Sequence, residues 1–133
     1  MREYMKLRMK GDSVRMRLAR GEVAKLLAAG RVEDCTRFGP ARTLTYRVKS
    51  DSAVNQPVAA FDGTVIEIRI PVRTLQEWCT NDDAITLSGV QREGGIELSI
   101  AVEKDFACLK PRAGEDESDN LPHPLAGNPG RGC

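Results

Sequence analysis

The chain has 133 residues, of which 41% are apolar and 29% charged, and its formal net charge is +1. This length and composition suit one globular domain and disfavour a second. The first ten residues alternate charged and apolar side chains without a long apolar run, which disfavours export and membrane insertion. We therefore expect a cytoplasmic protein with no membrane partner.

The charge is unevenly distributed along the chain. Residues 1–51 carry a net charge of +7, residues 52–112 a net −3, and residues 113–133 a further −3. A basic first half can attract a polyanion, but it can equally bind the acidic parts of its own chain. Charge alone does not decide between these two interpretations.

The four cysteines, Cys35, Cys79, Cys108 and Cys133, are scattered and form no C-x-x-C pair, while the single histidine is His123. Without a sign of export, this scatter favours free thiols over disulfides. Structural zinc sites normally use four Cys or His ligands in close local pairs. We therefore expect no bound metal and no cofactor.

The first half of the chain predicts two strands, a helix and two more strands. Apolar residues alternate with charged ones over residues 5–10 and 14–18, with a turn at Gly11-Asp12. The period then becomes helical from Gly21, and Gly30 is a natural end for the helix. Residues 31–38 and 43–49 predict two further strands joined at Gly39-Pro40.

The second half predicts the same order of elements after a polar connection over residues 51–57. Strands over residues 59–62 and 65–72 flank the turn dipeptide Asp62-Gly63. A helix with Leu75, Trp78 and Cys79 on its apolar stripe follows and ends at residues 81–83. Strands over residues 84–90 and 96–104 complete the series.

The two halves correspond at a spacing of 52 residues. Residues 14–18 align with residues 66–70, Leu26 aligns with Trp78, and the strand over residues 44–48 aligns with residues 96–100. The third strands match only if the spacing slips by one residue. We interpret this pattern as an internal repeat of residues 4–51 and 57–105.

The predicted fold class is therefore α+β. A single domain over residues 1–112 would hold two similar ββαββ halves, which form a mostly antiparallel eight-stranded sheet or barrel with two short helices. Residues 113–133 are acidic and almost free of apolar side chains, and they predict a disordered tail. The expected core includes Leu7, Met16, Tyr46, Val48, Phe61, Ile68, Trp78, Leu98 and Ile100.

Four segments resemble a family of small, uncharacterised bacterial proteins. They are KLRMKGDSVR at residues 6–15, RFGP at residues 37–40, VEKDFACL at residues 102–109, and the acidic tail EDESDNLP at residues 115–122, with its D-N-x-P pattern. The resemblance implies a bacterial, cytoplasmic protein. It implies no activity, cofactor or catalytic residue.

The polar positions of the predicted sheet are markedly basic. They include Lys6, Arg8, Lys10, Arg15, Arg17, Arg47, Lys49 and Arg69. In a barrel with this face inward, these groups would line a tunnel suited to phosphates and a divalent ion, as in the triphosphate-tunnel enzymes. The chain lacks the E-x-E-x-K strand of those enzymes. The alternative is an exposed face whose charges pair across strands.

A second charged group lies at Glu103, Lys104 and Asp105, shortly before Cys108. A nearby lysine can lower the pKa of a thiol, but Cys108 stands between apolar residues, and the trio also suits a strand end with ion pairs. The candidate ligand-binding residues are Arg15, Arg17, Arg47, Lys49, Arg69, Lys104 and Asp105. We find no candidate catalytic residue and no metal ligand set.

The leading functional prediction is a small binding or interaction module without catalysis, because reactive side chains are sparse. The first alternative is an enzyme or binder that acts on phosphorylated small molecules through the basic sheet face. The second is a nucleic-acid-associated protein, which the six aromatic residues disfavour because Arg37-Phe38 is the one basic–aromatic pair in a loop. Expected partners are an anionic small molecule or another protein.

Overall fold

Two strands, a helix and two strands occur twice in succession along the chain. The computed structural model describes residues 5–105. Its elements are β1 (Lys6–Met9), β2 (Ser13–Leu18), α1 (Arg20–Ala29), β3 (Arg31–Gly39), β4 (Arg42–Ser50), β5 (Val58–Phe61), β6 (Val65–Ile70), α2 (Val72–Thr80), β7 (Thr86–Glu93) and β8 (Ile96–Lys104). The α+β class and the two short helices are confirmed.

The strands form two four-stranded sheets. Sheet A has the order β1-β2-β8-β7 and sheet B the order β3-β4-β6-β5. The central pairs β2–β8 and β4–β6 are parallel, and the other pairs are antiparallel. The prediction of one eight-stranded sheet or barrel is wrong, because alternating apolar residues specify the buried face of a strand but not its neighbours.

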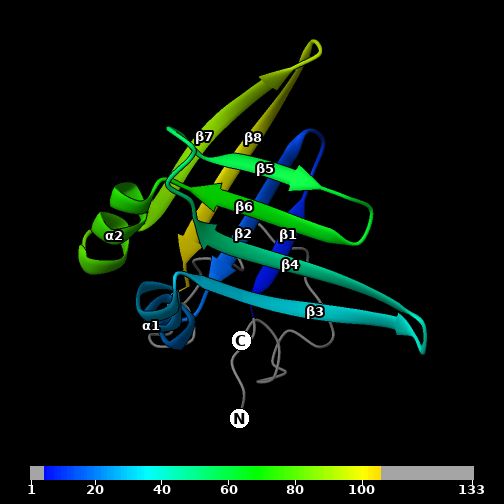
Figure 1. The fold of residues 1–133 in the computed structure, drawn as a ribbon, viewed down its shortest axis with the longest axis horizontal. Coiled ribbons are helices and arrows are strands. Elements are labelled where there is room, and N and C mark those ends of the chain that lie inside the picture. Colours follow the sequence, from blue (N-terminus) through cyan, green and yellow to red (C-terminus); the bar gives the residue numbers. More distant parts are fainter. Residues whose placement is uncertain (1–4, 106–133) are drawn as a thin grey trace, which may run out of the picture.

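The helices carry the chain from one sheet to the other. α1 connects β2 of sheet A to β3 of sheet B, and α2 connects β6 of sheet B to β7 of sheet A. Figure 1 shows the strands of the two sheets running across one another, with both helices at the same end. None of the helices in residues 5–105 is long and apolar enough to span a bilayer.

Glycines and carboxylates define the turns between these elements. Gly30 ends α1 with a left-handed φ of 80°, and its N–H donates to the Leu26 carbonyl at 2.8 Å. In the β5–β6 turn, the Asp62 carboxylate accepts the N–H groups of Thr64 and Val65, both at 2.8 Å, next to Gly63 with a φ of 101°. The predicted turns at Asp62-Gly63 and Gly30 are thus correct.

The core lies between the apolar faces of the two sheets and the helices. Met16, Val48, Ile68 and Val102 are fully buried, and Leu26, Leu75 and Trp78 close the core from the helices. The expected core positions are confirmed except for Phe61, which is 66% exposed. Phe61 is the last residue of the edge strand β5, where the sheet offers little cover.

The two sheets have the same arrangement of strands: β1, β2, β8 and β7 of sheet A correspond to β5, β6, β4 and β3 of sheet B. The strand pairing shows which residues correspond: Met16 lies opposite Val102, and Ile68 lies opposite Val48. Met16 and Ile68 are 52 residues apart, whereas Val48 and Val102 are 54 apart, so the predicted alignment of the fourth strands is wrong by two. The connection between α2 and β7 is longer than the single Gly30 between α1 and β3, and the β7–β8 hairpin is one residue shorter than the β3–β4 hairpin.

The third strands correspond at a still larger spacing. Val32 lies opposite Val48, and Leu87 lies opposite Val102, so Val32 and Leu87 are equivalent at 55 residues. The division of the chain into an internal repeat and a tail stays a prediction. Residues 113–133 and Cys108 lie outside the described residues.

Candidate functional site

The predicted basic residues lie on two separate surfaces. Val14, Met16 and Leu18 of β2 are buried, so the alternate residues Arg15 and Arg17 face outward from sheet A. By the same alternation, Arg47, Lys49 and Arg69 face outward from sheet B. The sheets pack through their apolar faces, and the two basic groups therefore lie on opposite sides of the molecule. The tunnel hypothesis is wrong.

We call the outer side of sheet A face A. Its basic part consists of Lys6 and Arg8 from β1 and Arg15 and Arg17 from β2. Lys6 stands directly opposite Arg17, and Arg8 directly opposite Arg15. Like charges in directly opposed positions destabilise a sheet, so this arrangement needs compensating groups.

The compensation on face A is incomplete. Glu103 of β8 forms ion pairs with both neighbouring arginines, Arg15 at 3.0 Å and Arg17 at 3.2 Å, and accepts a hydrogen bond from Nε of Arg17. Asp105 pairs with Lys6 at 3.1 Å. Among residues 5–105, Arg8 has no carboxylate within ion-pair distance. Face A therefore keeps an excess of positive charge around Arg8 and Arg15.

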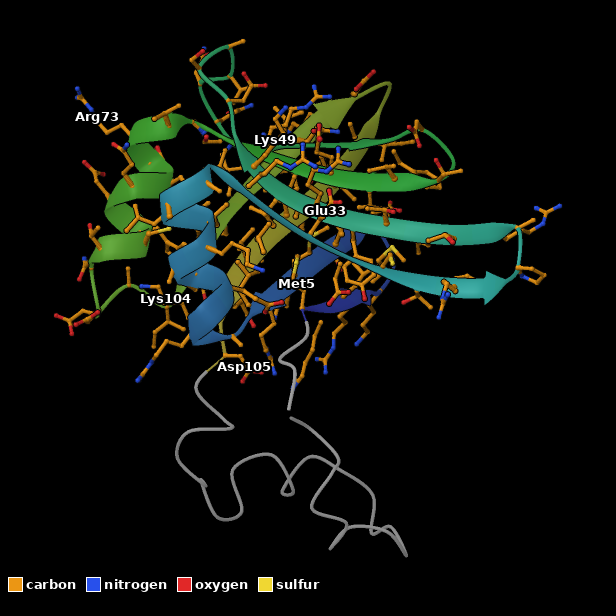
Figure 2. The ribbon with its side chains drawn as sticks, turned by 60° about the horizontal axis from the view of Figure 1, so that its bottom comes forward. Met5, Glu33, Lys49, Arg73, Lys104 and Asp105 are labelled. Atoms are coloured by element: carbon orange, nitrogen blue, oxygen red, sulfur yellow. The ribbon has the colours of Figure 1, made fainter. Side chains whose placement is uncertain are left out.

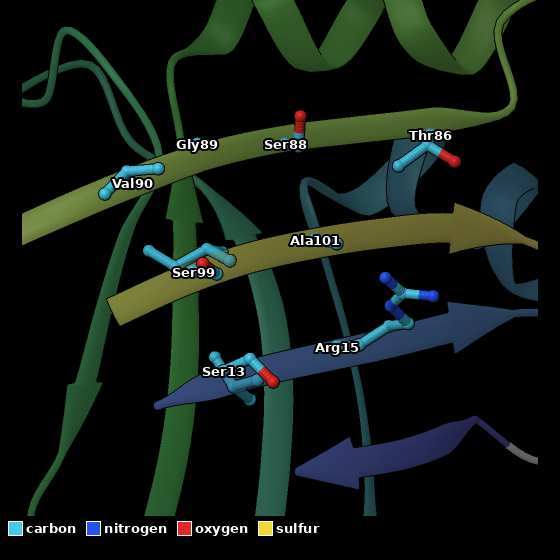
Figure 3. A pocket seen from close by; sticks show the side chains of 10 residues that line it. Ser13, Arg15, Thr86, Ser88, Gly89, Val90, Ser99 and Ala101 are labelled. Carbon is cyan, nitrogen blue, oxygen red and sulfur yellow. The ribbon is translucent and has the colours of Figure 1, made fainter. Parts of the chain in front are cut away.

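A shallow hollow adjoins Arg15 on face A. It measures about 440 Å³, and its floor consists of small side chains and a glycine from β2, β8 and β7 (Figure 3). The hydroxyl groups around it belong to Ser13, Thr86, Ser88 and Ser99. A second hollow of about 130 Å³ lies between β1 and β2, and it too is lined by Arg15. Guanidinium and hydroxyl groups thus meet around one surface.

We call the outer side of sheet B face B. Its first row crosses the strands as Glu33, Arg47 and Glu67, and its second row as Arg31, Lys49 and Arg69. Arg47 is held from both sides, with Nε 2.7 Å from Glu33 and Nη1 2.7 Å from Glu67. The two carboxylates also bind the outer members of the second row, Arg31 at 3.1 Å and Arg69 at 2.6 Å.

These contacts shift the pKa values of Arg47 and Glu67 so that the charged form of each is favoured. The hydrogen bond to Glu67, followed by that to Glu33, raises the pKa of Arg47. Burial would raise the pKa of Glu67, but hydrogen bonds from Arg47 and Arg69 hold it below its ordinary value. Both shifts favour the charged forms of Arg47 and Glu67.

Lys104 and Asp105 do not join Arg15 or Arg47 in one site. Lys104 is buried between β8 and α2, where its Nζ donates to the Asn81 carbonyl at 2.8 Å and lies 5.0 Å from the centre of the Trp78 ring. Figure 2 shows both residues away from Lys49 and Glu33 on sheet B. Asp105 belongs with Lys6 at the margin of face A.

Sequence reasoning did not select the hydroxyl groups of face A or the role of Arg31. The alternation of Ser99, Ala101 and Glu103 with the buried Ile100 and Val102 contains the necessary signal. It shows that two outward positions of β8, Ser99 and Ala101, carry small side chains. The exposed Arg31 opposite Lys49 could have been found only with the strand register known.

Cys35 and Cys79 are free thiols, and burial raises the pKa of Cys79. Within residues 5–105, no group of three or more His, Cys, Asp or Glu residues is arranged to hold a metal ion.

Fold and surface define this protein as a two-sheet α+β domain with two oppositely placed, charged outer faces. The chain belongs to a family of unknown function, DUF7009, whose sequence profile matches residues 5–125. No curated protein and no solved structure matches it. The resemblance to an uncharacterised family is thus confirmed, while bacterial origin stays an expectation.

Proposed function

We propose that this protein is a small binding module that takes a phosphorylated small molecule on face A. The observation that carries the proposal is the position of Arg15, which lines both hollows and stands directly opposite the uncompensated Arg8. A phosphate group placed between these two guanidinium groups would relieve their repulsion. The ligand would thereby stabilise an arrangement that the sheet alone disfavours.

The chemistry of face A suits a phosphate with an oxygen-rich organic part. Guanidinium groups bind phosphate through paired, charge-assisted hydrogen bonds. The hydroxyl groups of Thr86, Ser88 and Ser99 line the hollow beside Arg15 and can donate to or accept from a sugar-like body. The Ser13 hydroxyl donates to the Lys10 carbonyl at 2.6 Å and can accept from the same ligand. The larger hollow, at about 440 Å³, is within the range of small-molecule sites.

Binding without turnover is part of the proposal, since face A supplies charge and hydrogen-bond donors around a shallow, open floor. We also propose a cytoplasmic location. The exposed free thiol of Cys35 supports a reducing compartment.

The test is a calorimetric titration of the full chain with orthophosphate, a hexose phosphate and a nucleoside monophosphate. Arg8→Gln and Arg15→Gln should each weaken binding about tenfold or more, as expected for one lost charge-assisted contact. Arg73→Gln is the matched control, because this substitution also removes one positive charge, but from α2, away from face A (Figure 2).

Two further measurements probe the electrostatic origin of binding. Affinity should fall as salt is raised, since ions screen exposed charges. Removing residues 113–133 should strengthen binding, because that segment carries a net charge of −3. Absence of binding by all three phosphates, or an equal loss in the Arg73→Gln control, would refute a phosphate site on face A.

A further inference from the structure

We infer that face B holds a second anion site, distinct from face A, at the row formed by Arg31, Lys49 and Arg69. Its ligand class is a small multivalent anion with three or more negative charges, such as an oligophosphate or a polycarboxylate. We call these three residues the cation row. The inference does not depend on the function proposed for face A.

The cation row places three like charges side by side on adjacent strands. Lys49 lies directly opposite Arg31 on one side and Arg69 on the other. Among residues 5–105, Lys49 has no carboxylate within ion-pair distance. Opposed like charges cost stability in a sheet, and here the cost occurs twice in one row.

The equivalent row of sheet A provides an internal comparison. Lys49 is the counterpart of Glu103, because Val48 and Val102 are equivalent in the two sheets. Glu103 lies opposite Arg17, which is the counterpart of Arg69, and binds it at 3.2 Å. The same backbone thus accommodates a charge-compensating glutamate in sheet A, whereas sheet B has a third cation at this position.

The neighbouring carboxylates hold the row in place without occupying it. Glu33 binds Arg31 through a single nitrogen, Nη2, and Glu67 binds Arg69 through Nε. Each guanidinium has five N–H donors, so further donors stay available to a ligand. Arg47 is the least exposed of the arginines on face B, with 22% of its side chain accessible, and it fixes both carboxylates between the strands.

The spacing of the row selects ligands with several charges. Neighbouring strands lie about 4.8 Å apart, so the first and third cations start from positions roughly 10 Å apart. One orthophosphate cannot contact all three groups without large side-chain movements. A chain of phosphates or a tricarboxylate can contact them together, and affinity should therefore rise steeply with the number of anionic groups.

The experiment titrates the full chain carrying Arg15→Gln, which weakens face A, with orthophosphate, pyrophosphate, tripolyphosphate and citrate. Affinity should increase from orthophosphate to tripolyphosphate by about tenfold or more for each added contact. Comparing tripolyphosphate with citrate distinguishes a phosphate ligand from a carboxylate ligand. Amide chemical-shift changes should centre on Arg31, Lys49 and Arg69.

Lys49→Glu is the decisive variant, because it gives sheet B the residue that sheet A already has at the equivalent position. It should fold normally and lose binding of both multivalent anions. Lys25→Glu on the exposed part of α1 is the matched control, and its affinity for both multivalent anions should change little. Lys49→Gln serves the same purpose if Lys49→Glu does not fold.

Unchanged tripolyphosphate and citrate affinity in the Lys49 variants, or equal affinity for ortho- and tripolyphosphate, would overturn the inference. Failure of the face A proposal would appear instead as insensitivity to Arg8→Gln and Arg15→Gln. The two results are separate, because the residues lie on opposite faces.

Discussion

Replacing Lys104 separates the contribution of its buried stem from that of its charge. Lys104 is 9% exposed at the end of β8, and its Nζ contacts the Asn81 carbonyl at 2.8 Å. The same carbonyl accepts the Ala84 N–H at 3.0 Å. Removal of the ammonium group therefore leaves no unsatisfied carbonyl behind.

The expected magnitudes follow from these contacts. Lys104→Met keeps a side chain of similar volume. The variant loses a charge-assisted hydrogen bond but no longer buries a charge, and these two effects oppose each other. The free energy of unfolding should therefore change by less than about 1 kcal/mol. Lys104→Ala additionally removes three buried methylene groups at roughly 0.8 kcal/mol each. The alanine variant should therefore be about 2 kcal/mol less stable than the methionine variant.

The pH dependence tests the role of the charge. Burial lowers the pKa of Lys104 from its ordinary value of 10.5. Between the lowered native pKa and 10.5, the unfolded chain binds more protons than the native protein, so the stability of the wild type rises with pH in this window. The stability of the wild type minus that of Lys104→Met should therefore increase from about pH 7 to about pH 10.

Urea unfolding of the three proteins across this range measures both effects. Burial raises the pKa of Cys79 from 9.0, while the charge of Lys104 lowers it, so all three chains are compared in a Cys79→Ala background. A wild-type advantage that stays flat or falls with pH would refute the buried-charge argument. Equal stability of the methionine and alanine variants would refute the packing argument.

Two further substitutions test how the sheets are joined. Gln91→Ala should cost about 1–3 kcal/mol in urea unfolding, because the Gln91 amide accepts the Ala59 N–H at 2.8 Å and donates to the Ala59 carbonyl at 3.2 Å, linking β7 of sheet A to β5 of sheet B. Unaltered stability would contradict this link. Gly89→Ala should cost about 1–3 kcal/mol, since its Cβ would lie 3.2 Å from the Pro57 ring. Ser88→Ala, on the exposed side of the same strand, should change thermal stability little, and equal losses in both variants would rule out the proposed clash.

Local patterns predicted the elements well, because alternation and turn chemistry are properties of short segments. Met16 and Ile68 are buried as the alternation requires, and Gly30 ends its helix as expected. Local patterns did not predict which strands lie next to one another. A strand with one apolar face satisfies the same pattern in a barrel or in a pair of sheets, and Phe61 at the end of an edge strand cannot be recognised as exposed from its spacing.

The candidate site was predictable only in part for the same reason. Outward-facing arginines can be read from the period of β2, but the opposition of Arg8 to Arg15 depends on the hairpin register. Lys104 continues the inward row of β8 after Ile100 and Val102, and a lysine at such a position is buried only because α2 covers it with Trp78. This long-range contact left no local signal.

The two halves share the contacts that hold the frame. The Asp51 N–H donates to Ile70 at 2.9 Å, and the equivalent Asp105 N–H donates to Leu18 at 2.8 Å. Ser50 and Lys104, also equivalent, each have a side chain that bonds the carbonyl of the residue ending the preceding helix of their half, Ser50 to Gly30 and Lys104 to Asn81.

The outer faces do not share their chemistry in this way. Lys49 on sheet B corresponds to Glu103 on sheet A, and Arg15 on sheet A corresponds to Glu67 on sheet B. A frame that is kept alike in both halves can tolerate either charge at these outward positions, because outward residues contribute little to packing. The fold therefore does not require either charge at these positions, and single substitutions there can test the proposed binding without altering the frame. For this reason Lys49→Glu takes as its replacement the residue that stands at the equivalent position of sheet A.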